Sequence, residues 1–193
     1  MGSTDSLASC LRKNPDNQEM YAVMLGKILK EIHSTEVPTD KLPNIKARYR
    51  HWIDEIKELS DSKTSVFSNI IDSIADKNTY VHGDINLNSV MVLDGELLLM
   101  DMAGSAYGNP LFDLASLYAS LVGIANTDDG YCRRTFGISK EHCLAFWETF
   151  FNVYMDGNQD AIKSMTELLS KYFVLKENVL MKVEEKHKLQ HTS

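Results

Sequence analysis

Residues 80–104 read YVHGDINLNSVMVLDGELLLMDMAG, and this stretch decides the fold. Two apolar runs, Ser89–Leu93 and Glu96–Met100, flank the pair Asp94-Gly95. An Asp-Gly pair between two such runs is the strongest short signal for a hairpin, because both turn positions favour positive φ. The stretch therefore predicts a small β-hairpin near residues 89–101.

Carboxylates stand at both ends of the predicted hairpin. Asp84 closes the sequence His82-Gly83-Asp84 before it, and Asp101 follows it, seventeen positions later. Each aspartate alone is explained equally well as a turn or cap residue, and His82 alone as a hydrogen-bonded loop histidine. Whether these residues form a functional site therefore depends on the sequence pattern around them.

Three helices are predicted before the hairpin. The first has Asp16 or Asn17 as its cap and ends near His33 or Ser34, the second follows Pro43, and the third spans residues 63–75. In each, apolar residues recur at three- and four-residue steps. The expected buried stripe of the first helix is Met20, Val23, Met24, Ile28 and Ile32, with Lys27 as its one polar member.

Three more helices are predicted after the hairpin. One follows Pro110 and carries Asp113 in its first turn, where the helix dipole favours a negative charge. A loop rich in Asp, Gly and Thr comes next, then a helix capped by Ser139 and a long final helix opened by Asp160. The fold class is therefore mainly α with a small β-hairpin.

A chain of 193 residues is long enough for one domain with a hydrophobic core, and we expect one domain. We expect a polar amino-terminal segment over residues 1–15, a single helical domain over 16–185 and a frayed tail over 186–193. No internal repeat or low-complexity segment divides the chain.

Composition excludes several classes of function. The formal charge of −7 argues against binding to nucleic acid and mildly favours cationic small molecules. The three cysteines lack the spacing of a zinc site or a disulfide framework, which fits a reducing cytoplasm. No apolar stretch reaches the roughly 18 residues of a membrane span, so we expect no membrane association and a cytoplasmic location.

The whole pattern resembles the aminoglycoside phosphotransferase and choline kinase superfamily, whose architecture is that of the protein kinases. His-Gly-Asp, a short loop, a hairpin and a second Asp follow the order of its catalytic core. MLGKILKEIHSTEVP is similar to the helix before that core, and GNPLFDLASLY to the segment after it.

The resemblance implies roles for particular residues. Asp84 would orient the acceptor hydroxyl and take its proton, and Asp101 would ligate magnesium that bridges the phosphates of ATP. His82 and Gly83 would shape the loop, and Asp113 would open the helix that follows. The implied cofactors are Mg²⁺ and ATP.

The sequence departs from the family at two places. The family has an Asn five residues after the catalytic Asp as a second metal ligand, and this chain has Ser89 there, beside Asn88. We expect Ser89 to take the role, with Asn88 as the alternative.

The second departure concerns the amino-terminal lobe of the family, a twisted β-sheet that holds the nucleotide. Only about 15 residues precede the first expected helix, and the chain contains no Gly-rich phosphate loop. We therefore expect the carboxyl-terminal lobe alone, with the β lobe absent. If Met1-Gly2-Ser3 is a cloning remnant, we expect that the lobe was removed by design; otherwise we expect it to be supplied by a partner or to have been lost.

The predicted function is phosphorylation of a small-molecule hydroxyl by ATP, incomplete in this chain because the nucleotide-binding lobe is missing. The alternative is a catalytically silent module for binding or assembly. Such a module would expose hydrophobic surface near the hairpin and favour self-association or a partner. An unrelated helical domain with a chance His-Gly-Asp ranks last, because it leaves the ordered pattern unexplained.

Overall fold

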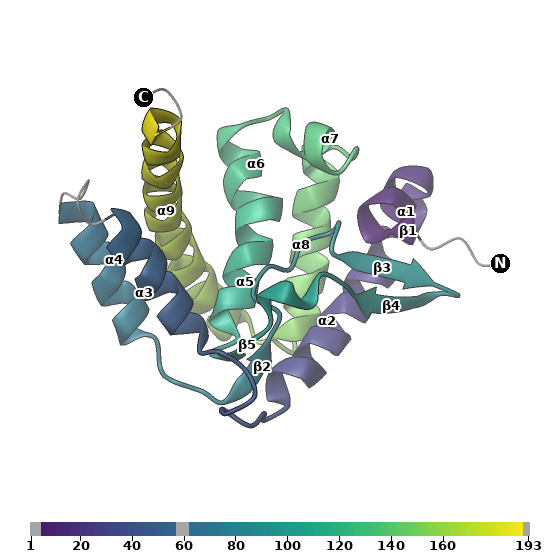
Figure 1. Cartoon of the computed structure of the whole chain (residues 1–193). Helices are drawn as coiled ribbons and strands as arrows, with labels where there is room; N and C mark the ends of the chain where they lie inside the picture. Colours follow the sequence, from purple (N-terminus) through teal and green to yellow (C-terminus); the bar gives the residue numbers. More distant parts are fainter. Residues whose placement is uncertain (1–4, 57–61, 191–193) are drawn as a thin grey trace.

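The computed structural model describes residues 5–56 and 62–190 of the chain. Helices form most of it, as the sequence predicts, and two small antiparallel β elements accompany them (Figure 1). In chain order, the amino-terminal half contains β1 (Asp5–Ser6), α1 (Leu7–Lys13), the 3-10 turn η1 (Pro15–Asn17), α2 (Gln18–Ser34), α3 (Ile45–Ile56), α4 (Ser62–Ser73) and β2 (Thr79–Val81).

The remaining elements begin with the hairpin. They are β3 (Val90–Leu93), β4 (Glu96–Leu99), the 3-10 turn η3 (Met102–Gly104), β5 (Ala106–Gly108), α5 (Leu111–Tyr118), the π-helical segment η4 (Ala119–Gly123), α6 (Ile124–Thr127), α7 (Tyr131–Thr135), α8 (Lys140–Tyr154) and α9 (Gln159–Gln190).

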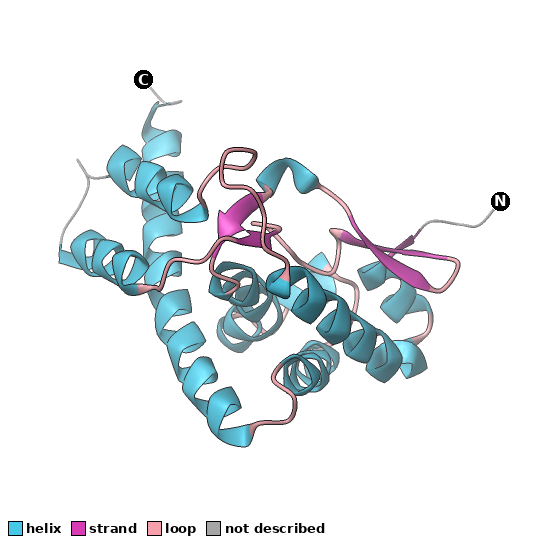
Figure 2. Cartoon of the chain, turned by 90° about the horizontal axis from the view of Figure 1, so that it is seen from below, coloured by secondary structure: helices cyan, strands magenta, loops and turns pink. Residues whose placement is uncertain are grey.

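The predicted hairpin is confirmed. Strands β3 and β4 pair antiparallel with Leu93 opposite Glu96, and the turn residues Asp94 and Gly95 have φ of 51° and 84°. Positive φ at both positions is the geometry that the Asp-Gly pair favours. Figure 2 shows the hairpin at the opposite side of the molecule from α3 and α4.

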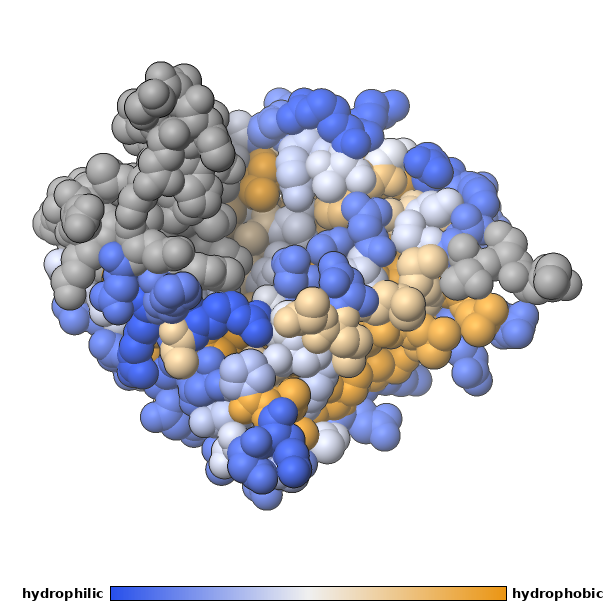
Figure 3. Space-filling model, viewed as in Figure 1, coloured by the Kyte–Doolittle hydropathy of each residue, from blue (hydrophilic) through white to orange (hydrophobic). Residues whose placement is uncertain are grey.

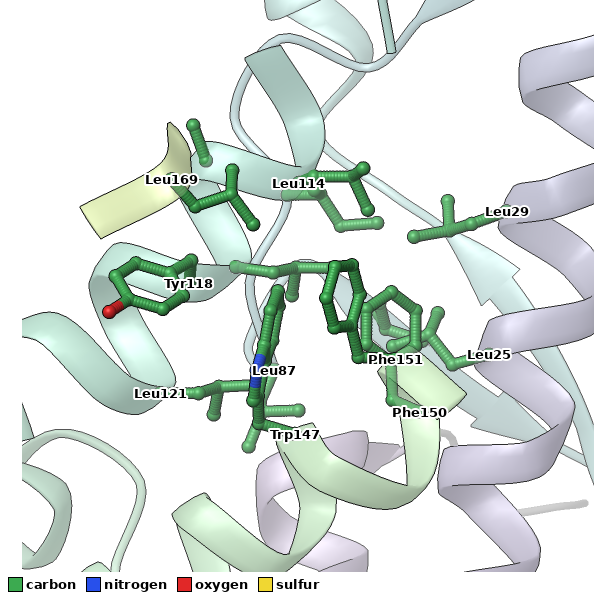
Figure 4. Close-up of a cluster of buried hydrophobic side chains, with 14 of the residues drawn as sticks. Leu25, Leu29, Leu87, Leu114, Tyr118, Leu121, Trp147, Phe150, Phe151 and Leu169 are labelled. Carbon is green, nitrogen blue, oxygen red and sulfur yellow. The ribbon is translucent and has the colours of Figure 1, made fainter. Parts of the chain in front are cut away.

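The helices pack around α5. Helix α2 lies along α8, while α3 and α4 pack against α9, and side chains from all these layers meet in one hydrophobic cluster. Figure 4 shows part of that cluster, in which Leu25 and Leu29 of α2 face Phe150 and Phe151 of α8. Burial of apolar area of this kind supplies most of the driving force for folding.

The buried face of α2 differs from the predicted stripe. The structure buries Tyr21, Ala22, Leu25, Leu29 and His33, and leaves Met20 47% exposed. The predicted stripe instead lies at the edge of the core, where its later members are only partly buried. The prediction of which face of α2 is buried was wrong, because apolar residues lie on more than one face of this helix. Helical periodicity alone therefore does not select the buried face.

Residues 5–13 are more structured than the expected polar segment. Ser6 caps α1 by accepting a hydrogen bond from Ser9 N, and β1 pairs with β3. Leu7 and Leu11, one turn apart, are buried in the core. A helix of seven residues, about two turns, is too short for a clear periodic signal, which is why the sequence did not predict it.

Two other differences concern chain ends and short strands. Helix α9 continues to Gln190, whereas we expected a frayed tail from residue 186; residues 191–193 lie outside the described part. Strands β2 and β5 form a two-stranded ribbon that the sequence did not predict. The division of the chain into domains stays a prediction.

Candidate functional site

The first turn of α5 holds a fully buried carboxylate. Asp113 is 0% exposed, and its two oxygens accept hydrogen bonds from His82 N and Gly83 N, both at 2.7 Å. A buried charge is costly unless hydrogen bonds compensate for it. Asp113 therefore fixes the backbone of the two residues directly before Asp84.

A second pair of side chains completes this buried network. His33 Nε2 lies 3.0 Å from the Asp113 carboxylate, and His33 Nδ1 lies 2.9 Å from the Tyr154 hydroxyl. A carboxylate only accepts, so Nε2 donates to it, and a neutral imidazole then accepts the Tyr154 O–H at Nδ1. Burial, reinforced by the Asp113 charge, raises the pKa of Tyr154 well above its ordinary value.

The loop that carries Asp84 lies against the loop that carries Asp101. His82 Nε2 donates to Met100 O at 2.7 Å. Gly83 has φ of +86°, and a Cβ there would lie 2.1 Å from Gly104 O, so only glycine permits this approach. These contacts hold the two loops side by side.

Both predicted site aspartates are free to meet a ligand. Asp84 and Asp101 are exposed, and within residues 5–56 and 62–190 neither carboxylate takes part in a hydrogen bond or an ion pair. Asp101 has φ of 60°, a left-handed conformation at the start of η3. The structure thus brings two unengaged carboxylates to neighbouring loops.

Ser89 and Asn88 differ in the availability of their oxygens. The buried Ser89 hydroxyl accepts from Asn86 N at 2.9 Å and donates to Asn86 O at 3.1 Å, so it closes the loop. Asn88 is exposed, and its amide nitrogen donates to Thr135 O. In the described part of the chain its amide oxygen accepts no hydrogen bond.

The oxygen donors of Asp101 and Asn88 fit magnesium, which prefers hard oxygen ligands and keeps several waters. No set of three or more His, Cys, Asp or Glu side chains gathers as a metal cluster among the described residues. A site that bound magnesium here would therefore rely on water and on nucleotide oxygens as further ligands.

A cavity of about 290 Å³ opens beside Asp84. Its walls come from the Asp84 loop, from α5 through α7, and from α9. The lining residues are Asp84, Asn86, Asn88, Ser116, Ala119, Ser120, Ile124, Tyr131, Thr135, Phe136 and Phe173. The volume lies at the lower end of the range for small-molecule sites, about 300–1,000 Å³.

Sequence reasoning missed His33, Tyr154 and most of the cavity wall. His33 and Asp113 are 80 positions apart, and no local pattern links them. The prediction for Asp113 was a helix-start charge, which is correct in position but incomplete, because the structure also ties it to His82 and Gly83.

A model of the family described as "Phosphotransferase enzyme family" matches residues 5–147. A search of curated proteins found no match. Among the described residues, no helix is both long and apolar enough to cross a membrane.

Three solved structures are similar to the chain. The choline kinase LicA from Streptococcus pneumoniae has 14% identity and a TM-score of 0.45, covering 95% of this chain and 68% of that one. Spectinomycin phosphotransferase APH(9)-Ia, in complex with ADP and spectinomycin, has 16% identity and a TM-score of 0.39, covering 85% and 65%. ADP-bound aminoglycoside phosphotransferase APH(2'')-Ib has 16% identity and a TM-score of 0.41, covering 90% and 71%. The chain thus spans 65–71% of the length of these structures.

Proposed function

This chain belongs to the phosphotransferase enzyme family, and we propose that it serves the transfer of the terminal phosphate of ATP to a hydroxyl of a small molecule. The observation that carries the proposal is the pair of exposed carboxylates, Asp84 and Asp101, on two neighbouring loops. The loops are joined by the hydrogen bond from His82 Nε2 to Met100 O and by the close approach of Gly83 to Gly104 O. Phosphoryl transfer depends on positioning the acceptor hydroxyl and on stabilising the charge of the phosphates. In a pair of carboxylates, one can orient the hydroxyl and the other can hold the metal ion that stabilises the charge.

Asp84 is the catalytic residue of this proposal. It accepts a hydrogen bond from the acceptor hydroxyl, orients the oxygen and takes the proton as the new O–P bond forms. Asp113 is a positioning residue, because its two hydrogen bonds to His82 N and Gly83 N set the loop that carries Asp84.

Asp101 holds magnesium in this proposal, and the amide oxygen of Asn88 assists. Bound magnesium would neutralise the charge on the phosphates during transfer. The structure favours Asn88 over Ser89, because the Ser89 hydroxyl is buried and already hydrogen-bonded within its own loop. The His82 side chain has a supporting role, because its hydrogen bond to Met100 O joins the two loops.

The nucleotide needs further contacts. No glycine-rich phosphate loop accompanies the two aspartates in the described ranges, so we propose that transfer needs a nucleotide-binding segment in addition to these residues. The acceptor is a small molecule with a hydroxyl, and the formal charge of −7 is compatible with a cationic one.

Thermal stability with ligands tests the proposal. We expect ATP and magnesium together to raise the Tm of the wild type, because a ligand that binds only the native state stabilises it, by about 2.7 kcal/mol at 100 times Kd. Asp101→Asn should abolish that rise. Asp94→Asn is the matched control, since it makes the same chemical change at an exposed hairpin turn. A rise that survives in Asp101→Asn would contradict the role of Asp101.

A second candidate function has its own observation. An apolar groove of about 390 Å³ lies between α2 and β4, lined by Ile28, Ile32, Thr35, Val37, Tyr80, Leu97, Leu98, Leu99 and Met102. Figure 3 shows hydrophobic residues gathered over these elements. Met100 and Met102 are 51% and 48% exposed beside it. Such a surface favours a silent assembly module that associates with itself or a partner.

Light scattering over a range of protein concentrations separates the two candidates. A silent module predicts growth of the particle mass with concentration and no Tm shift with any nucleotide. A monomer at all concentrations, together with a shift that needs Asp101, would leave only the first candidate.

A further inference from the structure

The cavity beside Asp84 is lined by two kinds of residue. Asp84, Asn86 and Asn88, on the loop before the hairpin, are polar, and three hydroxyl residues join them: Ser116, Ser120 and Thr135. Apolar and aromatic residues come from α6, from α7 and the residue that follows it, and from α9: Ile124, Tyr131, Phe136 and Phe173. A ligand that fills this cavity therefore meets both polar groups and hydrocarbon.

Charge in the cavity is limited to one carboxylate. Of its lining residues in the described part of the chain, only Asp84 is charged. In the turn between α6 and α7, Asp128 and Asp129 are paired with Arg134 and Lys140 respectively. A ligand with several ammonium groups needs several carboxylates once its water is removed, because an unpaired buried charge is costly.

An irregular helix forms part of the cavity wall. Residues Ala119–Gly123 form a π-helical segment between α5 and α6, and Ala119 and Ser120 within it line the cavity. Gly123 lets the Phe173 ring lie against this segment, since a Cβ at Gly123 would come within 2.6 Å of the ring. π-Helical segments are frequent at functional sites, where they displace a side chain from its regular position.

We propose that this cavity takes a small alcohol whose hydroxyl is attached to an apolar body, carrying at most one positive charge, and that it excludes polyamines. The inference rests on the proposed function, in which Asp84 receives the acceptor hydroxyl. The polar loop receives the hydroxyl end of the alcohol, and Ile124, Phe136 and Phe173 cover its apolar body.

Binding of matched probes tests the proposal without nucleotide or catalysis. The probes are 3,3-dimethylbutan-1-ol, ethylene glycol, which lacks the apolar body, and neamine, which is a polyamine. Backbone amide NMR shifts locate the binding, and high ionic strength screens attraction of neamine to surface charges. We expect dimethylbutanol to shift the amide resonances of residues that line the cavity, and to bind at least about tenfold more tightly than ethylene glycol.

Two variants sharpen the result. Ile124→Ala removes half-buried hydrocarbon from the apolar wall and should weaken dimethylbutanol binding about fivefold. Ser116→Asp adds a second carboxylate to the wall and should strengthen neamine binding. Val66→Ala is the control, because it removes exposed hydrocarbon from α4, outside both the cavity and the groove, and should leave both affinities unchanged.

Neamine that binds wild-type protein in the cavity more tightly than dimethylbutanol would overturn the inference. Equal binding of dimethylbutanol and ethylene glycol, or no binding of any probe in the cavity, would do so as well. These failures are distinct from failure of the proposed function, which is tested by the Tm rise with ATP and magnesium and its dependence on Asp101.

Discussion

Asp113 and the pair Asp84 and Asp101 are carboxylates of one small region with opposite surroundings. Asp113 is fully buried and hydrogen-bonded to His82 N, Gly83 N and His33. Asp84 and Asp101 are exposed, and neither side chain is engaged within the described residues. One carboxylate is therefore tied into the loop geometry, while the other two have no such partner in the described residues, as the proposed function requires. Four predictions test this contrast.

The largest effect is expected for Asp113→Ala. The change leaves His82 N, Gly83 N and His33 without their acceptor in the core, and unsatisfied buried donors cost about 1–3 kcal/mol each. We expect the free energy of unfolding to fall by about 3–5 kcal/mol, measured by urea denaturation. A loss no greater than that of Asp101→Ala would remove the contrast between the two kinds of carboxylate.

Gly83→Ala comes next, and Gly95→Ala is its matched control. Both glycines have nearly the same φ, +86° and +84°, but a Cβ at Gly83 meets Gly104 O at 2.1 Å, while a Cβ at Gly95 meets nothing within 4 Å. Backbone strain alone costs about 1–2 kcal/mol, which is the expectation for Gly95→Ala. Gly83→Ala should cost about 3 kcal/mol or more, since the two loops must also separate. Equal losses would show that the loops need no such contact.

Tyr154→Phe is expected to lower the free energy of unfolding by about 1 kcal/mol, because it removes the hydrogen bond between the Tyr154 hydroxyl and His33 Nδ1. Burial and the Asp113 charge raise the pKa of Tyr154 in the folded state, so the folded protein keeps this proton above pH 10, where the unfolded chain loses it. The stability that the proton provides is therefore fully present below the ordinary pKa of 10 and is lost as pH rises from 10 towards the folded pKa. Wild-type stability should therefore fall more steeply than that of Tyr154→Phe at alkaline pH. Parallel pH profiles from urea denaturation would contradict the network.

The smallest effect is expected for Asp84→Asn and Asp101→Asn. Neither carboxylate has a partner to lose in the described structure, so the free energy of unfolding should change by less than about 0.5 kcal/mol. Urea denaturation of each variant checks this. A loss comparable to that of Asp113→Ala would mean that these side chains hold the fold and are not free for a ligand.

The hairpin was predictable because its signal is local. The two apolar runs and Asp94-Gly95 define the turn within about a dozen residues, and the register follows from the turn. The helix starts at Ser139 and near Asp160 were predictable for the same reason. The buried face of α2 was not, because several of its faces are apolar and only the packing against α8 selects one.

The candidate site was predictable only in part. The positions of Asp84 and Asp101 on either side of the hairpin follow from the sequence. The choice between Ser89 and Asn88 does not, because it depends on which oxygen is taken up by hydrogen bonds inside the loop. The sequence order favoured Ser89, and the hydrogen bonds favour Asn88 for the proposed metal site.

The sequence by itself determined the mainly helical class, the hairpin and the two aspartates at its ends, because these depend on patterns within a few turns of chain. Only the tertiary structure decided that Asp113 organises the Asp84 loop through His82 N and Gly83 N while His33 bonds to the same carboxylate, and that α6, α7 and α9 close a cavity beside it. Such contacts join residues far apart in sequence, and the packing of the core sets which donors and acceptors meet there.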